Sequence, residues 1–366
     1  MVVFSTRDWE VKLKANSHPR ELVVEVATTC NLDCVHCFRK SARGLETRVM
    51  SLELFERVLE SAVEAGVEKV VFSGWGEPLT NPYVGEMIEA CRDRGVKVAI
   101  NTNGTLINKY LDVIAKYVDE LYISLDAATV KTYSYIRKSA SLDQVLQGLL
   151  KIIEIKRLSG SLKPTVKAVF AVMKTNIHEI GAFLEFAAKI GINEVVFTHT
   201  IPHSGVRSEE CMDSEECIEG FSSEFSRVLG KLALELGVSI TAPSKLGGAL
   251  LSCPFAENRA LFVRCDGAIT PCINYAYSWK PRILGVEREV KEVILGNVQR
   301  DSLMDVWRGS YAKMLFKLHF KKMPSCLTCT LMLYCAKTRG NEVDCLGNSP
   351  TCGHCPYFHK LSFCPL

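Results

Sequence analysis

The chain has 366 residues, and its shares of hydrophobic (48%) and charged (23%) residues are those of an ordinary globular protein rather than a disordered or fibrous one. Its 44 basic and 41 acidic residues are interleaved and leave a formal net charge of +3, so we expect neither nucleic acid nor an anionic membrane as a partner. Residues 1–20 lack the apolar core of a secretory signal, and no stretch approaches the roughly 20 apolar residues of a spanning helix. These features predict a cytoplasmic protein with two domains, or with one barrel-sized domain and an appendage.

From residue 21 to about residue 202, short β-branched runs alternate with segments whose apolar residues recur three and four positions apart. Six strand–helix units in succession predict an α/β fold with a parallel sheet, covered by helices, whose chemistry lies at the carboxyl ends of the strands. The predicted strands are 21–27, 69–73, 97–101, 120–125, 165–173 and 194–198, and the predicted helices are 51–65, 84–94, 109–117, 142–158 and 177–190.

The periodic pattern lapses in a polar, acidic stretch at 204–217, and a helix is predicted over 216–236. We therefore expect an N-terminal segment at 1–20, a barrel domain at 21–210, a helical linker at 211–250 and a cysteine-rich domain at 251–366. Within that tail, 261–272 predicts a hairpin, because Asp266 and Gly267 supply the positive φ of a tight two-residue turn. A helix is predicted over 302–319. The rest of the tail offers little core, so metal would have to hold it.

Sixteen cysteines are the outlying feature of the composition. In an ordinary cytoplasm, grouped cysteines more often bind metal or do redox chemistry than form disulfides. Cys30, Cys34 and Cys37 directly follow the first predicted strand. Three thiolates in so short a loop can wrap one face of an iron–sulfur cubane and leave one iron open to a substrate or cofactor. A zinc loop that takes its fourth ligand from elsewhere, or buried thiols without metal, are the alternatives.

This loop resembles the cluster-binding loop of the radical SAM superfamily, with His36 where that family has an aromatic residue before the last cysteine. The family's Gly-Glu-Pro stretch after the second strand is matched by Gly76-Glu77-Pro78, a piece that in isolation also suits a simple turn. The resemblance implies a partial (βα)6 barrel and a 4Fe-4S cluster on the three cysteines. S-adenosylmethionine would chelate the open iron, and Glu77 would accept a hydrogen bond from its amino group.

Three weaker matches follow the fourth predicted strand. The resemblance implies ribose contacts for Ser124 and Asp126, and a contact of Arg137 with the methionine carboxylate. Each of these residues could instead be a helix cap or a solvated charge. The stretch 102–104 also fits the family and equally fits a turn. The implied chemistry is reductive cleavage of S-adenosylmethionine to a 5′-deoxyadenosyl radical that removes a hydrogen atom from a substrate.

The tail resembles the SPASM extension of radical SAM enzymes, which binds two auxiliary 4Fe-4S clusters. The resemblance implies Cys253, Cys265 and Cys272 for the first cluster. In the second group, the pattern expects a further cysteine four residues after Cys335. This chain has Arg339 at that position, and Cys345 could take the role after a longer loop. Zinc at one tail site is the alternative, because two CxxC pairs also suit a zinc ribbon. The implied ligands of the second cluster are Cys326, Cys329 and Cys335, with its last ligand open among Cys352, Cys355 and Cys364.

SPASM enzymes mostly crosslink ribosomally made peptides or oxidise a sulfatase residue. Ile273 follows Cys272 where sulfatase maturases carry an aspartate, which weakens that assignment. The stretch 344–355, closed by Cys364 and Pro365, resembles the end of archaeal radical SAM maturases of tungsten-cofactor oxidoreductases. The partners implied are a reduced ferredoxin-like donor and a tungstopterin oxidoreductase, or else a peptide substrate. An iron–sulfur electron carrier and a zinc-stabilised binding module are the non-enzymatic alternatives.

Overall fold

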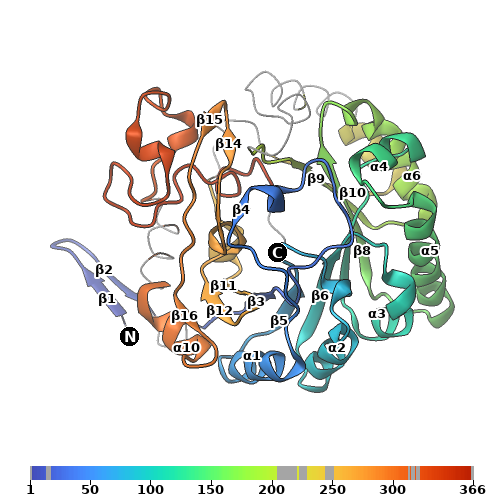
Figure 1. Cartoon of the computed structure of the whole chain (residues 1–366), viewed down its shortest axis with the longest axis horizontal. Helices are drawn as coiled ribbons and strands as arrows, with labels where there is room; N and C mark the ends of the chain where they lie inside the picture. Colours follow the sequence, from blue (N-terminus) through green and yellow to red (C-terminus); the bar gives the residue numbers. More distant parts are fainter. Residues whose placement is uncertain are drawn as a thin grey trace.

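The computed structural model describes residues 2–13, 18–203, 229–243, 251–311 and 322–363, together with Phe221, Met314 and Leu318. Its centre is a ten-stranded sheet in the order β10-β9-β8-β7-β6-β5-β3-β11-β12-β16 (Figure 1). From β10 to β11 each strand is parallel to its neighbours, whereas β12 and β16 are antiparallel. The strands are β3 (Glu21–Val24), β5 (Lys69–Phe72), β6 (Lys97–Thr102), β7 (Glu120–Ser124), β8 (Thr165–Val172), β9 (Glu194–His199), β10 (Ser239–Thr241), β11 (Ala260–Val263), β12 (Ala268–Thr270) and β16 (Gly296–Asn297).

Helices form a ring outside the sheet (Figure 1). The side chains of Ser51 and Ser141 cap the helices that follow them, and Gly160 ends the longest of these helices at φ +64°. The predicted succession of six strand–helix units is confirmed, with bounds within a few residues. The helices are α1 (Leu52–Glu64), α2 (Val84–Asp93), α3 (Leu111–Tyr117), α4 (Val130–Ile136), α5 (Leu142–Ser159), α6 (Ile180–Ile190) and α8 (Gly230–Leu236).

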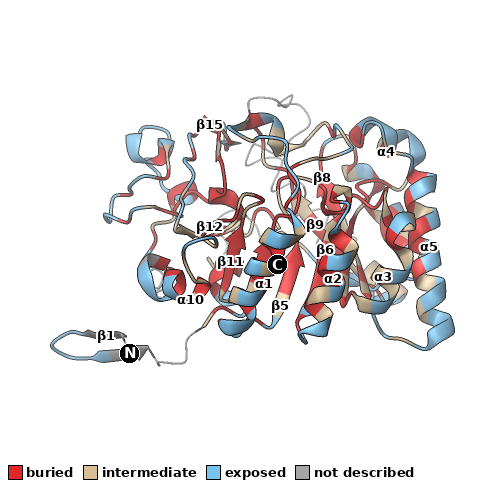
Figure 2. Cartoon of the chain, turned by 60° about the horizontal axis from the view of Figure 1, so that its bottom comes forward, coloured by how far each residue is buried: buried red, intermediate tan, exposed pale blue. Residues whose placement is uncertain are grey.

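Alternation along the strands produces two separate cores. Leu22 and Val24 face outward and pack with the helices, whereas Val23 faces inward. The inward core joins Val23 to Trp75 of the barrel and to Trp279 of the tail. Figure 2 shows these strands as buried, between the helices and the tail. The inside of the barrel is therefore packed largely by the cysteine-rich tail.

The tail hairpin extends the barrel sheet, because β11 pairs in parallel with β3. Its turn differs from the prediction: only Gly267 has a positive φ, of +82°, and Asp266 does not. The amide of Gly267 donates to the carbonyl of Arg264, and the amide of Arg264 donates to the carbonyl of Ala268. The loop thus has three residues, a turn followed by a left-handed glycine, rather than two.

Several elements were not predicted, among them the hairpin of β1 (Val2–Ser5) and β2 (Glu10–Leu13), the helix α4, and β10, which lies in the expected helical linker. Most of the predicted helix 216–236 precedes the described residues of α8. The predicted helix 302–319 begins as α10 (Leu303–Val306) and leaves helical geometry at Gly309, and most of its remainder lies outside the described residues. Within the described ranges, every helix is too short or too polar to span a bilayer.

Candidate cluster and cofactor sites

Cys30, Cys34 and Cys37 line one cleft at the carboxyl ends of β3, β5, β6 and β7, which we call the front cleft. It contains about 700 Å³ of non-atom space, including its open mouth. No other cysteine of the described chain lines it. Five more of the predicted site residues share its wall: His36, Gly76, Glu77, Ser124 and Arg137 also line it, whereas Asp126 does not.

Gly76 joins the second-strand motif to the cysteine loop. A Cβ atom at this position would lie 2.3 Å from the carbonyl oxygen of Ala27 and 2.6 Å from that of Thr29, so no other residue fits. The next amide, of Glu77, donates to the carbonyl of Thr29 at 2.7 Å. The two motifs that are far apart in the sequence are therefore in backbone contact just before Cys30.

The carboxylate of Glu77 is 3% exposed and already accepts three hydrogen bonds. Its Oε1 accepts from the amide of Leu79 (3.1 Å) and the hydroxyl of Thr102 (2.7 Å), and its Oε2 accepts from the amide of Asn103 (2.7 Å). Burial raises the pKa of Glu77, and these donors oppose that rise. Because a carboxylate has about four acceptor positions, one remains on Oε2 for an amino group.

Arg137 reaches the front cleft while paired with Asp126. The guanidinium Nε and Nη2 atoms donate to Asp126 Oδ2 at 2.6 and 2.5 Å, and Nη1 lies 4.0 Å from the sulfur of Cys34. Burial lowers the pKa of Arg137, but the Asp126 and Cys34 charges more than offset this and raise it above its ordinary value. Arg137 is thus a fixed positive charge beside one thiol and a candidate for a carboxylate contact.

Asp126 does not fit the predicted ribose contact. It is fully buried, its Oδ1 accepts from the amide of Ala171 at 2.7 Å, and its Oδ2 is occupied by Arg137. Its backbone has the left-handed φ of +57°, which turns the carboxylate away from the cleft wall toward β8. Asp126 therefore holds Arg137 in place, whereas Ser124 lines the cleft and its ribose contact stays a prediction.

His36 lies at the wall of the front cleft in place of the family's aromatic residue. Its Nε2 is 3.8 Å from Asp126 Oδ2, and its Nδ1 has no partner among the described residues. Burial lowers the pKa of His36 to about 4, with Asp126 opposing the shift. The ring is therefore neutral near pH 7, as an aromatic residue would be.

Asn103 is a site residue that the sequence interpretation left out. Its side-chain amide lies 3.9 Å from the sulfur of Cys30 and donates to Asn31 Oδ1 at 3.0 Å, while its backbone amide donates to Glu77. Its position directly after the third predicted strand was the available signal. Asn103 beside Cys30 and Arg137 beside Cys34 are thus two hydrogen-bond donors next to the thiols of the front cleft.

Four cysteines of the tail line a second, enclosed pocket, which we call the tail pocket: Cys253, Cys272, Cys352 and Cys355. Tyr275 directs its hydroxyl to the sulfur of Cys352 at 3.7 Å, and Asn274 directs its amide to that of Cys355 at 3.8 Å. Burial raises the pKa of Cys272 and Cys352 well above the ordinary thiol value, and the neighbouring thiolates raise it further. Four thiols with sulfur-directed donors form a complete ligand set for one cluster.

Four other cysteines of the described tail form a second group: Cys326, Cys329, Cys335 and Cys345. Burial raises the pKa of Cys326 to about 11, and the charges of Cys345, Asp344, Cys335 and Cys329 raise it further. Gly353 separates this group from the tail pocket, because a Cβ there would lie 2.7 Å from the sulfur of Cys326. Cys345 is therefore the candidate for the fourth ligand of this group, as the sequence predicts after its longer loop.

Cys265 lies outside both sets, contrary to the prediction. Its sulfur donates to the carbonyl of Val26 at 3.7 Å and its amide to Glu25 Oε2 at 3.3 Å, so it faces the barrel. Cys352 and Cys355, rather than Cys265, line the tail pocket together with Cys253 and Cys272. Cys364, the other predicted candidate, lies outside the described residues.

The donor chemistry of the cysteine groups bears on what they could hold. Thiolates are the usual ligands of iron–sulfur clusters, in which each cysteine binds a different iron, and they also bind zinc. One group of thiols in the front cleft and two in the tail fit the ligand chemistry of iron–sulfur clusters.

Comparison with known proteins assigns the two parts of the chain. A profile of the radical SAM superfamily matches residues 24–187, and the SPASM profile, an iron-sulfur cluster-binding domain, matches residues 253–330. The chain carries a radical SAM domain and a SPASM domain. The predicted fold class, the 4Fe-4S clusters and S-adenosylmethionine as cofactors are thereby confirmed, and the protein is a radical SAM enzyme of the SPASM type.

One relative of full length is the "Tungsten-containing aldehyde ferredoxin oxidoreductase cofactor-modifying protein" of Pyrococcus furiosus, which is 26% identical over 94% of this chain and 97% of its own. Two solved structures share the fold. SuiB of Streptococcus suis bound to its precursor peptide SuiA has a TM-score of 0.62 and 19% identity over 87% of this chain and 71% of its own. The protein anSMEcpe with bound AdoMet and a Cp18Cys peptide has a TM-score of 0.63 and 16% identity over 94% and 96%.

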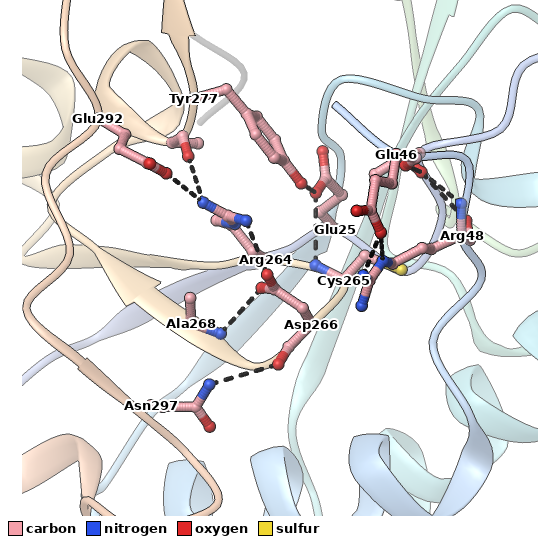
Figure 3. A network of polar contacts seen from close by, with 12 residues as sticks. Glu25, Glu46, Arg48, Arg264, Cys265, Asp266, Ala268, Tyr277, Glu292 and Asn297 are labelled. Atoms are coloured by element: carbon pink, nitrogen blue, oxygen red, sulfur yellow. Dashed lines mark hydrogen bonds and ion pairs between the residues drawn. The ribbon is translucent and has the colours of Figure 1, made fainter. Parts of the chain in front are cut away.

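A buried polar network ties the radical SAM domain to the SPASM domain (Figure 3). Glu25, at the end of β3, accepts from the hydroxyl of Tyr277 at 2.5 Å and from the amide of Trp75 at 2.7 Å. The Trp75 indole donates to the carbonyl of Ile273 at 3.0 Å, and its ring lies 5.6 Å from that of Trp279. Trp75 therefore lies between the front cleft and the tail pocket, whose linings include Trp75 and Ile273 respectively.

Replacing Glu25 by glutamine should remove a pH dependence of stability. Burial raises the pKa of Glu25 from 4.5 to about 7, with the Tyr277 hydrogen bond opposing the rise. The pKa of Glu25 is higher in the folded chain than in the unfolded one, so the protonated carboxyl favours folding. This contribution to the free energy of unfolding is lost as the pH rises from about 4.5 to 7. The loss integrates to about 3 kcal/mol. Between pH 5 and pH 7.5, we expect the free energy of unfolding of the natural chain to fall relative to that of Glu25→Gln, as measured by urea unfolding. Parallel pH profiles of the two chains would contradict this.

Proposed function

We propose that this protein cleaves S-adenosylmethionine at the front cleft in the maturation of a tungsten-cofactor oxidoreductase. The observation that carries the proposal is the composition of the cleft wall: three thiols and no fourth among the described residues, with a free acceptor position on Glu77 and the fixed charge of Arg137. A cluster on three thiols keeps one iron open to an amino-acid chelate.

The bound cluster and S-adenosylmethionine would supply the reductive cleavage that yields a 5′-deoxyadenosyl radical. The residues of the chain bind and orient. Cys30, Cys34 and Cys37 would hold the cluster, Glu77 would accept from the amino group of the methionine moiety, and Arg137 would pair with its carboxylate. Because Asp126 holds Arg137 through two hydrogen bonds, the guanidinium is oriented before the ligand arrives.

The tungsten assignment is supported by the full-length similarity to the Pyrococcus furiosus protein, whose name describes modification of a tungsten oxidoreductase cofactor. The resemblance of residues 344–355 to archaeal maturases agrees with it. Of this stretch, Cys352 and Cys355 line the tail pocket and Cys345 belongs to the second cysteine group. We propose that the subgroup motif supplies ligands to both tail clusters. We keep the limits 21–210 and 251–366 as the proposed domains.

We also propose a reduced ferredoxin-like protein as the electron donor. The second cysteine group reaches the surface, since Cys329 and Cys345 are exposed. Around them, the exposed apolar side chains of Leu331 and Tyr334 stand beside the exposed cations of Lys337 and Arg339. An apolar and basic surface suits an acidic carrier.

The test of the chemistry is anaerobic incubation with S-adenosylmethionine and dithionite. We expect 5′-deoxyadenosine and methionine; an electron carrier or a zinc-stabilised binding module would form neither. Mass spectrometry of a tungstopterin oxidoreductase and its cofactor, produced with and without this protein, then tests the substrate. An unchanged oxidoreductase would remove the tungsten assignment and leave the cleavage reaction standing.

The second candidate is modification of a peptide. It is supported by the shared fold with SuiB and anSMEcpe, both solved with peptides. A gene for a short peptide precursor beside this gene would favour the second candidate, whereas a gene for a tungstopterin oxidoreductase would favour the first.

A further inference from the structure

Arg288 is a buried cation without a carboxylate partner. The residue follows β15 (Val286–Glu287) and is 1% exposed. Its Nη1 donates to the carbonyls of Ile283 (2.7 Å) and Val286 (2.9 Å), whereas Nε and Nη2 have no hydrogen-bond partner in the described part of the chain. A guanidinium is charged at any physiological pH, so burial of two unpaired donors costs free energy unless a negative group faces them.

The second cysteine group provides that negative group. Ile283, whose carbonyl Arg288 binds, packs against Leu327, the neighbour of Cys326. The amide of Glu289 donates to the carbonyl of Arg339 in the loop after Cys335. Burial lowers the pKa of Arg288 to about 10, and the charge of Cys326 opposes this while that of Arg339 adds to it. The packing of Ile283 and the hydrogen bond of Glu289 thus hold Arg288 next to the loops that carry Cys326 and Cys335.

The nearby carboxylate of Asp344 is occupied elsewhere. Its Oδ1 accepts from the amides of Leu346 and Asn348, and its Oδ2 accepts from the side chains of Asn348 and Thr351. These four hydrogen bonds fill its acceptor positions. The thiolates, and an anionic cluster on them, are therefore the charges left for Arg288.

We propose that Arg288 is the fixed counter-charge of the cluster held by Cys326, Cys329, Cys335 and Cys345, and that it raises the reduction potential of this cluster. The proposal rests on the auxiliary clusters of the proposed function. A cluster with four thiolate ligands is anionic and becomes more so when it takes up an electron. A buried cation at short range stabilises the reduced form more than the oxidised one, because little solvent screens it. The cluster nearest the surface would thus accept electrons more readily.

The test is an EPR-monitored redox titration of the full chain with Cys30, Cys34 and Cys37 replaced by alanine, so that only the auxiliary clusters titrate. In this background we compare Arg288→Met and Arg288→Lys. We expect Arg288→Met to keep the iron of both auxiliary clusters and to lower one of the two midpoint potentials, and Arg288→Lys to restore most of that shift. Arg339→Met is the matched control: it removes the same charge from an exposed side chain in the loop of Cys335, and solvent screening should make its effect smaller.

Unchanged potentials in a fully loaded Arg288→Met chain would overturn the proposal, as would an equal shift in Arg339→Met. If Arg288→Met fails to load the second cluster, rescue by Arg288→Lys supports the counter-charge role, and failure of both variants overturns it in favour of packing. The titration does not require cleavage of S-adenosylmethionine, so its outcome is separate from that of the proposed function. Zinc in place of iron at this site would contradict the auxiliary cluster itself and is detected first, by metal analysis.

Discussion

Replacing Cys34 by alanine should abolish formation of 5′-deoxyadenosine while the tail keeps its iron. Cys34 is one of three thiols in the front cleft, and its sulfur is the one beside Arg137. With two thiols left the cluster has too few ligands, so we expect the iron content to fall by about four atoms per chain and the activity to fall to the uncatalysed background. Iron and sulfide analysis, with chromatography of the nucleoside product, measures both effects.

Cys91→Ala is the matched control for that variant. Cys91 is a fully buried cysteine on α2, packed in the core between helix and sheet and remote from the cleft wall. Its loss should cost some stability through the small cavity it leaves, but neither iron nor activity. Product formation by Cys34→Ala at the natural rate would remove the front cleft as the site of cleavage.

The barrel and its cleft were predictable because their determinants are local. Each strand is a short apolar run, three of the barrel helices begin at a capping Ser or Thr side chain, and parallel strands bring their carboxyl ends to one edge. Cys30 and Glu77 lie in the loops that follow β3 and β5, and Ser124 is the last residue of β7, so their meeting at one cleft follows from the topology. The geometry of Asp126 was not accessible in this way, since its left-handed backbone and its pairing with Arg137 depend on packing against β8.

The pairing of the tail cysteines could not be read from their spacing. The loops that carry them have few periodic segments, so the sequence does not say which loop returns to which. The pairing is fixed instead by contacts of long range: β11 pairs with β3, which turns Cys265 toward the barrel, and Tyr275 bonds to the backbone of Thr351, which brings Cys352 to Cys272. The same packing created the site of Arg288, whose neighbours come from three separate loops.

Cys352→Ser and Cys265→Ser should differ in the iron that the tail retains. The two variants together test whether the cluster ligands are those that the sequence spacing implies or those that the structure brings together. Cys352 lines the tail pocket with Cys253, Cys272 and Cys355, so Cys352→Ser should lose one auxiliary cluster, or about four iron atoms. Cys265 donates its thiol to the carbonyl of Val26, a contact that a serine hydroxyl can keep, so Cys265→Ser should retain all iron. Iron analysis and EPR of the dithionite-reduced chains measure the difference.

Cys355→Ser should lose the same amount of iron as Cys352→Ser, because both cysteines line the tail pocket. Equal losses in the two variants would argue against a local folding defect in one of them. Loss of four iron atoms from Cys265→Ser with retention in Cys352→Ser would restore the ligand set that the spacing implied. In the expected case, dithionite-driven cleavage at the front cleft survives in Cys352→Ser, because the three thiols there belong to the radical SAM domain. Turnover that needs electrons from the tail should then fail, since Trp75 would join the front cleft to a pocket that no longer holds a cluster.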